Sequence, residues 1–153
     1  MHIAELNIGR VRYALDDPRM AEFMDNLDRI NGLAERSPGF VWRMTGDGNN
    51  SMDVQFEGDP DVNINLSVWE SAEALEHFVW NTLHERFYRR KADWFQTPDT
   101  PYFVMWPVAV GHRPSLAEAF ARLKHLRAHG SSDYAYGWDG LPQLKAWMTK
   151  RCA

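Results

Sequence analysis

Six side chains that can take part in chemistry or ligand binding recur at spacings of three or four residues in one stretch of the chain. In order they are His77, Trp80, His84, Tyr88, Lys91 and Phe95. Residues at this spacing share one face of a continuous helix. Two imidazoles, a phenol, an ammonium group and two further aromatic rings on one face predict a site there for acid–base chemistry or for a bound ligand.

His84 is the residue to which we assign the chemistry, with Tyr88 and Arg90 as the next candidates. An imidazole titrates near neutral pH, so His84 suits a general base. It equally suits the axial ligand of a haem, a role that His77 can also fill. The alternative is a histidine on the helix surface, or one that caps the helix near a break at Asn81-Thr82.

A basic run of three residues, Arg89, Arg90 and Lys91, lies on the same predicted helix. Consecutive residues of a helix point in different directions, so at most one or two of them reach a pocket, and a solvated face is the alternative. Arg89 or Arg90 would hold a carboxylate through paired hydrogen bonds, either that of an acidic substrate or a haem propionate.

Aromatic residues are unusually frequent, with 7 Trp, 8 Phe and 5 Tyr making up 13% of the chain. Three of the tryptophans fall in predicted strands, where they can wall a pocket for a flat apolar or aromatic ligand or pack in a subunit interface. Asn65 shares a strand face with Trp69 and can donate a hydrogen bond inside the pocket. The expected substrate-binding residues are Trp42, Asn65, Trp69, His77, Trp80 and Trp106.

Motifs of several other chemistries are missing from the sequence. There is no Gly-x-Gly-x-x-Gly, Walker loop, His-Glu-x-x-His, Cys-x-x-Cys or Gly-x-Ser-x-Gly, which removes the usual support for nucleotide-dependent hydride transfer, phosphoryl transfer and serine hydrolysis. One cysteine, Cys152, and dispersed histidines provide no zinc constellation. We therefore expect no metal site, and either no cofactor or haem.

The elements that must position these residues follow from periodicity and turn residues. Alternation of apolar and polar residues predicts strands, and the 3/4 spacing of apolar residues predicts helices. Strands are expected over 2–12, 39–45, 62–70 and 102–110, with Pro107 marking an edge strand or a bulge. Helices are expected over 18–35, 72–95 and 115–128, with a long loop over 46–61 and a short helix near 142–150.

This order predicts an α+β domain of the ferredoxin-like, split βαβ type, with an antiparallel sheet and an extra C-terminal helix. Helices cover one face of such a sheet, and the large aromatic residues on its strands are too many for that face alone. We therefore expect a partner sheet on the second face, which gives a homodimeric α/β barrel. The domain covers 1–153, with a tail over 131–153.

The composition limits the partners. The net charge is −4, from 17 basic and 21 acidic residues, so we expect neither nucleic-acid nor membrane binding. The N-terminus has no features of a signal peptide, and one cysteine permits no internal disulfide. A cytoplasmic location is the expectation.

Several blocks of the sequence resemble the DUF3291 family. They are Ser67-Val68-Trp69-Glu70-Ser71, Leu75, Phe78, His84, Arg89-Arg90, Trp94-Phe95, the opening 2–7, the turn at 37–40 and Gly111-His112-Arg113-Pro114. The resemblance implies the dimeric α/β-barrel superfamily, which includes antibiotic-biosynthesis monooxygenases and haem proteins related to chlorite dismutase. It implies little about the reaction.

Three functions follow from these observations. The first is a monooxygenase-like enzyme of small-molecule, secondary metabolism that acts on an apolar or aromatic substrate. The second is a haem-dependent enzyme on the same barrel. The third is a non-enzymatic dimer that binds an aromatic metabolite.

Overall fold

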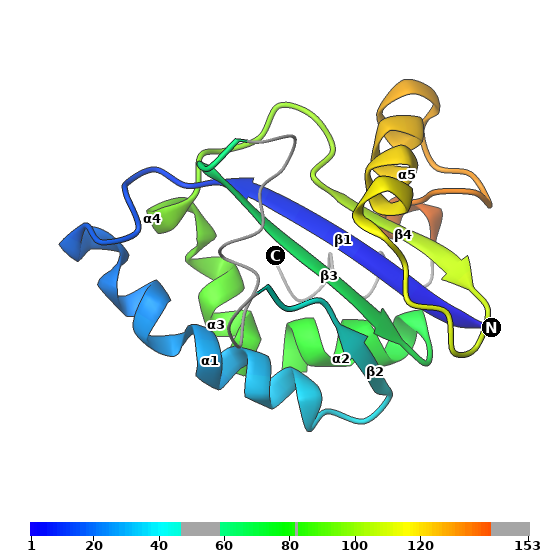
Figure 1. The fold of residues 1–153 in the computed structure, drawn as a ribbon, viewed down its shortest axis with the longest axis horizontal. Coiled ribbons are helices and arrows are strands. Elements are labelled where there is room, and N and C mark those ends of the chain that lie inside the picture. Colours follow the sequence, from blue (N-terminus) through cyan, green and yellow to red (C-terminus); the bar gives the residue numbers. More distant parts are fainter. Residues whose placement is uncertain (47–58, 82, 142–153) are drawn as a thin grey trace.

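Four antiparallel strands form one sheet in the order β2-β3-β1-β4 (Figure 1). The computed structural model describes residues 1–46, 59–81 and 83–141, with the side chains of residues 81, 83 and 84 outside that description. β1 (His2–Arg10) and β3 (Val62–Trp69) are central, and β2 (Phe40–Arg43) and β4 (Phe103–Val108) are the edges. This topology confirms the predicted ferredoxin-like α+β class.

The strand predictions held because alternation was the dominant signal. In β3, apolar residues at every second position face one side of the sheet, and residues 63, 65, 67 and 69 face the other. Pro107 lies near the end of β4, which is an edge strand, as the missing N–H of proline required. The predicted segment 39–45 is shorter in the structure, where β2 ends at Arg43.

Helices on one face of the sheet follow each of the first and third strands. α1 (Ala21–Glu35) comes after a 3₁₀ turn over Pro18–Met20, whose preceding Asp17 accepts a hydrogen bond from the backbone N–H of Arg19. α2 (Ala72–Asn81), α3 (Leu83–Arg89) and α4 (Lys91–Trp94) follow β3. Figure 1 shows α1 to α4 together on one side of the sheet.

The predicted helix over 72–95, for which a break at Asn81-Thr82 was considered, is interrupted at Arg90 in the described residues. At Arg90 the backbone leaves the helical conformation, with φ −98° and ψ 9°. The N–H of Arg90 bonds to the carbonyl of Phe87, three residues back, which is the tighter 3₁₀ pattern. The direction of the chain therefore changes between Arg89 and Lys91.

α5 (Leu116–His129) lies on the opposite face of the sheet (Figure 1). Ser115 caps it by accepting a hydrogen bond from the N–H of Glu118, and Gly130, with φ 75°, ends it. This is the predicted additional helix, and it covers part of the face that the sequence assigned to a partner. A second 3₁₀ turn spans Trp138–Gly140. The predicted helix near 142–150, and most of the predicted loop 46–61, lie outside the described residues.

The sheet has a buried core on each face. On one face Leu6, Leu66 and Trp106 form a cluster with residues of α5 such as Leu123. On the other, Trp69 and Met105 pack with residues of α2 such as Leu75, Phe78 and Val79. In the part of the chain that is described, no helix combines the length and the apolar character that crossing a lipid bilayer requires.

Candidate active site

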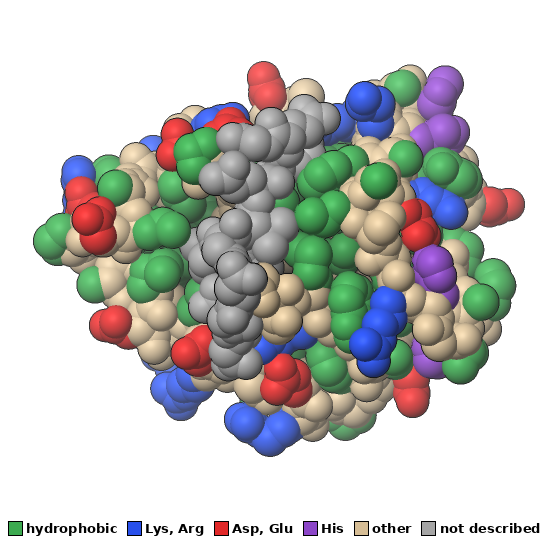
Figure 2. Space-filling model, viewed as in Figure 1, with side chains coloured by type: hydrophobic (Ala, Val, Ile, Leu, Met, Phe, Trp, Pro, Cys, Tyr) green, Lys and Arg blue, Asp and Glu red, His purple; other side chains and the backbone are tan. Residues whose placement is uncertain are grey.

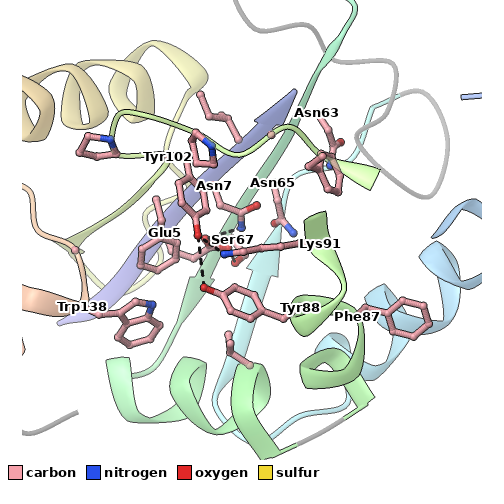
Figure 3. A pocket seen from close by; sticks show the side chains of 18 of the residues that line it. Glu5, Asn7, Asn63, Asn65, Ser67, Phe87, Tyr88, Lys91, Tyr102 and Trp138 are labelled. Atoms are coloured by element: carbon pink, nitrogen blue, oxygen red, sulfur yellow. Dashed lines mark hydrogen bonds between the residues drawn. The ribbon is translucent and has the colours of Figure 1, made fainter. Parts of the chain in front are cut away.

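A cavity of about 1030 Å³ lies between the sheet and the helices α1 to α4 (Figure 3). Its walls come from both central strands, from the helices that follow β3, and from the segments before and after β4. The lining residues that the argument uses are Glu5, Asn7, Asn65, Ser67, Trp69, Phe78, Tyr88, Lys91, Tyr102, Phe103 and Trp138.

The strand register places a polar stripe on the floor of this cavity. β1 and β3 pair antiparallel with Glu5 opposite Ser67 and Asn7 opposite Asn65. Because side chains alternate along a strand, these four residues point to the same face of the sheet. The face that the helices cover therefore carries polar groups at its centre, where burial would ordinarily favour apolar residues.

Glu5 is the most deeply buried member of the stripe, with 3% of its surface exposed. The hydroxyl of Ser67 donates a 2.6 Å hydrogen bond to Oε1 of Glu5, and Nδ2 of Asn7 donates a 3.2 Å bond to Oε2. The indole N–H of Trp69 donates to the Ser67 oxygen at 2.9 Å. Ser67 is thus oriented by Trp69 so that its proton points at the carboxyl group.

Burial raises the pKa of the Glu5 carboxyl from 4.5 to about 7, against the opposing effect of the hydrogen bonds from Ser67 and Asn7. Loss of hydration disfavours the charged form, and two donors do not fully replace the water. A carboxyl group with this pKa exchanges its proton near neutral pH. It therefore has the protonation behaviour of a general acid or base.

A second polar group at the cavity consists of Lys91, Tyr88 and Tyr102. Lys91 Nζ donates a hydrogen bond to the Tyr102 hydroxyl oxygen, and the hydroxyls of Tyr88 and Tyr102 are 3.5 Å apart. Nζ lies 4.1 Å from the ring centroid of Tyr88 and 4.9 Å from that of Tyr102. Figure 3 shows Lys91 reaching across the cavity to the two phenol groups.

The three groups change each other's proton affinity. Burial alone would lower the pKa of Lys91, but the hydrogen bond to Tyr102 outweighs it and the pKa is raised. Burial would raise the pKa of Tyr102, but the hydrogen bonds from Lys91 and Tyr88 bring it below its ordinary value. Burial raises the pKa of Tyr88. Lys91 is therefore a stable cation at neutral pH.

Aromatic rings make flat apolar walls beside these polar groups. Trp69 stacks on Phe78 with ring centroids 5.3 Å apart and an interplanar angle of 24°. Phe103 stacks on Trp138 at 5.3 Å and 11°. Such surfaces fit a planar ligand.

Of the predicted site residues, Asn65, Trp69 and Tyr88 line the cavity. His77 is exposed on α2, and Trp80 is buried beside Tyr88, with ring centroids 4.8 Å apart. Neither is among the described residues that line the cavity. The side chain of His84 lies outside the described residues, so its role stays a prediction.

Trp42 and Trp106, which the sequence assigned to the pocket wall, lie on the other face of the sheet from this cavity. Trp106 is fully buried against α5 and donates a 2.9 Å hydrogen bond to Glu118. A bulge in β2 separates Phe40, which pairs with Trp69, from Trp42, which pairs with Val68. One extra residue in a strand reverses the face of every residue beyond it, so Trp42 points away from the cavity.

Arg89 and Arg90 also lie away from the cavity. Arg89 pairs with Glu85 at 2.7 Å, and Arg90 pairs with Glu22 at 2.7 Å and with Asp93 at 3.0 Å. Both side chains are about half exposed. In this basic run it is Lys91, directly after the turn at Arg90, that lines the cavity.

Sequence reasoning missed Glu5, Asn7, Ser67 and Tyr102 as site residues. The signal was available in part. β1 and β3 carry polar residues at alternate positions, a pattern typical of a sheet with one solvated face. In a ferredoxin-like sheet these central strands have helices on that face, so the polar positions mark a polar cavity.

The fold and this cavity define an α+β protein of the ferredoxin-like type with a site of small-molecule size beneath its helices. The chain belongs to the DUF3291 family, a domain of unknown function, whose model matches residues 2–152. Among solved structures, the fold is similar to that of SnoaB, a cofactor-independent oxygenase from Streptomyces nogalater. The TM-score is 0.50 at 16% sequence identity, over 76% of this chain and 98% of SnoaB. No curated protein matches the sequence.

Proposed function

We propose that this protein is a monooxygenase-like enzyme of small-molecule metabolism, in which Glu5 is the general base that deprotonates an aromatic or apolar substrate. The observation that carries the proposal is a carboxyl group at the floor of a large cavity, with a pKa of about 7 and fixed by Ser67 and Asn7. A base with this pKa is half ionised near neutral pH, where proton transfer is most effective.

The reaction class follows from what a substrate anion can do in such a cavity. A deprotonated, electron-rich phenol passes electrons to O₂, which then adds to ring carbon. One oxygen atom stays in the product as a carbonyl, the other leaves as water, and the substrate supplies all four electrons. The protein contributes the base, the orientation of the ring and a water-poor environment. SnoaB, which shares the fold, is a cofactor-independent oxygenase, and this supports the proposal.

The stacked rings supply the orientation. Trp69 and Phe78 stand next to the Glu5–Ser67 pair, because Trp69 itself donates to Ser67. A planar substrate that contacts this aromatic pair would lie next to Glu5.

Oxygen consumption tests the proposal. The wild-type protein, without added cofactor, is mixed with a panel of hydroxynaphthalenes and anthrones, and O₂ uptake is followed with an electrode. We expect uptake with at least one compound, and loss of most of it in Glu5→Gln. Glu73→Gln, the same change at an exposed position of α2, is the control. Full activity of Glu5→Gln would assign the base to another residue.

The haem alternative depends on one histidine. Among the described residues no histidine lines the cavity, and Arg89 and Arg90 are engaged with carboxylates outside it. An axial ligand would thus have to be His84. A Soret band in the absorption spectrum of protein purified from haem-supplemented cells, lost in His84→Ala, would favour haem over the base mechanism.

We also propose that the protein is a homodimer through the sheet face that carries α5. Ile8, Trp42, Met44, Leu116 and Phe120 are apolar residues on this side that are only partly buried. Figure 2 shows hydrophobic side chains gathered on this face beside α5. Pairing two such faces would remove them from water. Light scattering at micromolar concentration should give the mass of two chains, and a monomer would contradict the proposal.

A further inference from the structure

We propose that Lys91, Tyr88 and Tyr102 form a subsite for an anionic oxygen of the ligand, either a carboxylate or an ionised hydroxyl. The proposal rests on the proposed function and narrows its substrate class. The proposed substrate is then an aromatic molecule that carries one negative charge next to its ring, and not any apolar or aromatic molecule.

The first step is that the contacts of Lys91 differ from those of its basic neighbours. In the described part of the chain, the ion pairs of this region join Arg89 to Glu85, and Arg90 to Glu22 and Asp93. The recorded contacts of the Lys91 ammonium group are with two tyrosines. Among the described residues no carboxylate forms an ion pair with Lys91, and a half-buried cation of this kind at a cavity is complementary to a negatively charged ligand.

The second step is hydrogen-bonding capacity. An ammonium group has three N–H donors, and Lys91 uses one of them on Tyr102. Tyr88 contributes a hydroxyl 3.5 Å from that of Tyr102. A ligand oxygen that meets these groups receives a charge-assisted bond from Lys91 and a neutral bond from a phenol. Charge-assisted bonds are about twice as strong as neutral ones.

The third step is shape. The rings of Tyr88 and Tyr102 flank the ammonium group at 4.1 and 4.9 Å, so the route to Nζ is narrow and bordered by aromatic surface. A flat anion whose charge is conjugated with, or attached to, an aromatic ring fits this slot. A branched tetrahedral anion such as a phosphate monoester fits it poorly.

The fourth step is the relation to Glu5. Both groups line the same cavity, with Glu5 on the strand floor and Lys91 reaching in from the helices (Figure 3). With Glu5 protonated, Lys91 is the fixed charge of this pair and the cavity favours an anion. When the ionised Glu5 takes the proton of a hydroxyl ligand, the negative charge moves from the carboxylate to the ligand oxygen, where the Lys91 cation stabilises it.

Binding of three naphthalene ligands to the purified protein tests the subsite without any turnover. Isothermal titration calorimetry at pH 7 would give the dissociation constants of 2-naphthoate, 2-naphthol and neutral 2-naphthalenemethanol. We expect 2-naphthoate or 2-naphthol to bind at least about tenfold more tightly than the neutral alcohol. If 2-naphthol is the tight ligand, the absorption spectrum of the bound molecule should be that of its ionised form. The first result identifies a carboxylate site and the second an ionised-hydroxyl site.

Variants identify the residues. Lys91→Met should remove the roughly tenfold preference, so that anionic and neutral ligands bind with similar affinity, whereas Lys91→Arg should retain much of the preference. Tyr102→Phe should weaken anion binding less than Lys91→Met does, and it provides an independent test if Lys91→Met does not fold. Lys124→Met, the same loss of charge at an exposed position of α5, is the control and should change nothing.

The outcomes separate the two proposals. Equal affinity of the neutral and anionic ligands, no binding of any of the three, or an anion preference that survives Lys91→Met and Tyr102→Phe would overturn the subsite. Anion-selective binding that needs Lys91, in a protein that takes up no oxygen with any compound, supports the subsite and contradicts only the proposed oxygenase function.

Discussion

Ser67 and Glu5 lie directly opposite each other on paired central strands and share a 2.6 Å hydrogen bond. The register of β1 and β3 holds the two residues opposite each other on one face of the sheet. The charge state of the candidate base is therefore linked to the stability of the sheet, and stability measurements can report on the site.

Glu5→Gln should change how stability depends on pH. The pKa of Glu5 is about 7 in the folded chain against an ordinary value of 4.5, so the folded state binds the proton more tightly. Its contribution is fully present below pH 4.5 and is lost as pH rises through 7. The loss is on the order of 3 kcal/mol. Urea unfolding at several pH values should show this decline in the wild type and not in Glu5→Gln. Parallel curves for the two proteins would contradict a raised pKa.

Ser67→Ala should move the titration of Glu5 to higher pH. The Ser67 hydroxyl stabilises the ionised carboxylate, so its removal raises the pKa of Glu5 further. The midpoint of the acidic limb of the pH–activity profile should move to higher pH, and the activity at alkaline pH should match that of the wild type. The indole N–H of Trp69 also loses its acceptor, at a cost in unfolding free energy of about 1–3 kcal/mol. A profile that does not move would show that Glu5 is not the titrating base.

The fold was predictable because each strand carried its own alternation and each helix its own capping residues. Asp17 and Ser115 are residues of types that favour a helix start, and in the structure each accepts a hydrogen bond from a backbone N–H at the beginning of its helix. The site depended on features with no local signal. The bulge between Phe40 and Trp42 reverses a strand face, and nothing in the sequence Phe-Val-Trp-Arg marks it.

Two further differences have similar causes. The shared helical face from His77 to Phe95 assumed unbroken geometry, and the turn at Arg90 ended it. Glu5 was recognisable only once the topology placed helices over its face of β1, since a polar residue in an alternating strand otherwise indicates solvent. Local pattern fixes the elements, but non-local packing decides which polar residues become a site.

His84→Gln separates the two candidate bases. If Glu5 is the base, this variant should keep a substantial part of the oxygen uptake and leave the pH dependence of activity unchanged. Loss of activity in His84→Gln with full activity in Glu5→Gln would instead confirm the prediction made from the sequence. Circular dichroism spectra of both variants should match the wild type, as a check that the fold is intact.

Trp69→Phe and Trp106→Phe form a matched pair that tests which sheet face binds the ligand. Both tryptophans are at most 1% exposed, and each donates one hydrogen bond from its indole nitrogen, to Ser67 and to Glu118 respectively. Each change removes similar packing and one hydrogen bond, so both should lower the free energy of unfolding by about 1–3 kcal/mol. Only Trp69 lines the cavity, so only Trp69→Phe should weaken the binding of 2-naphthoate. An equal loss of affinity in the two variants would mean that the ligand does not bind in this cavity, or that it binds at the face beneath α5 as well.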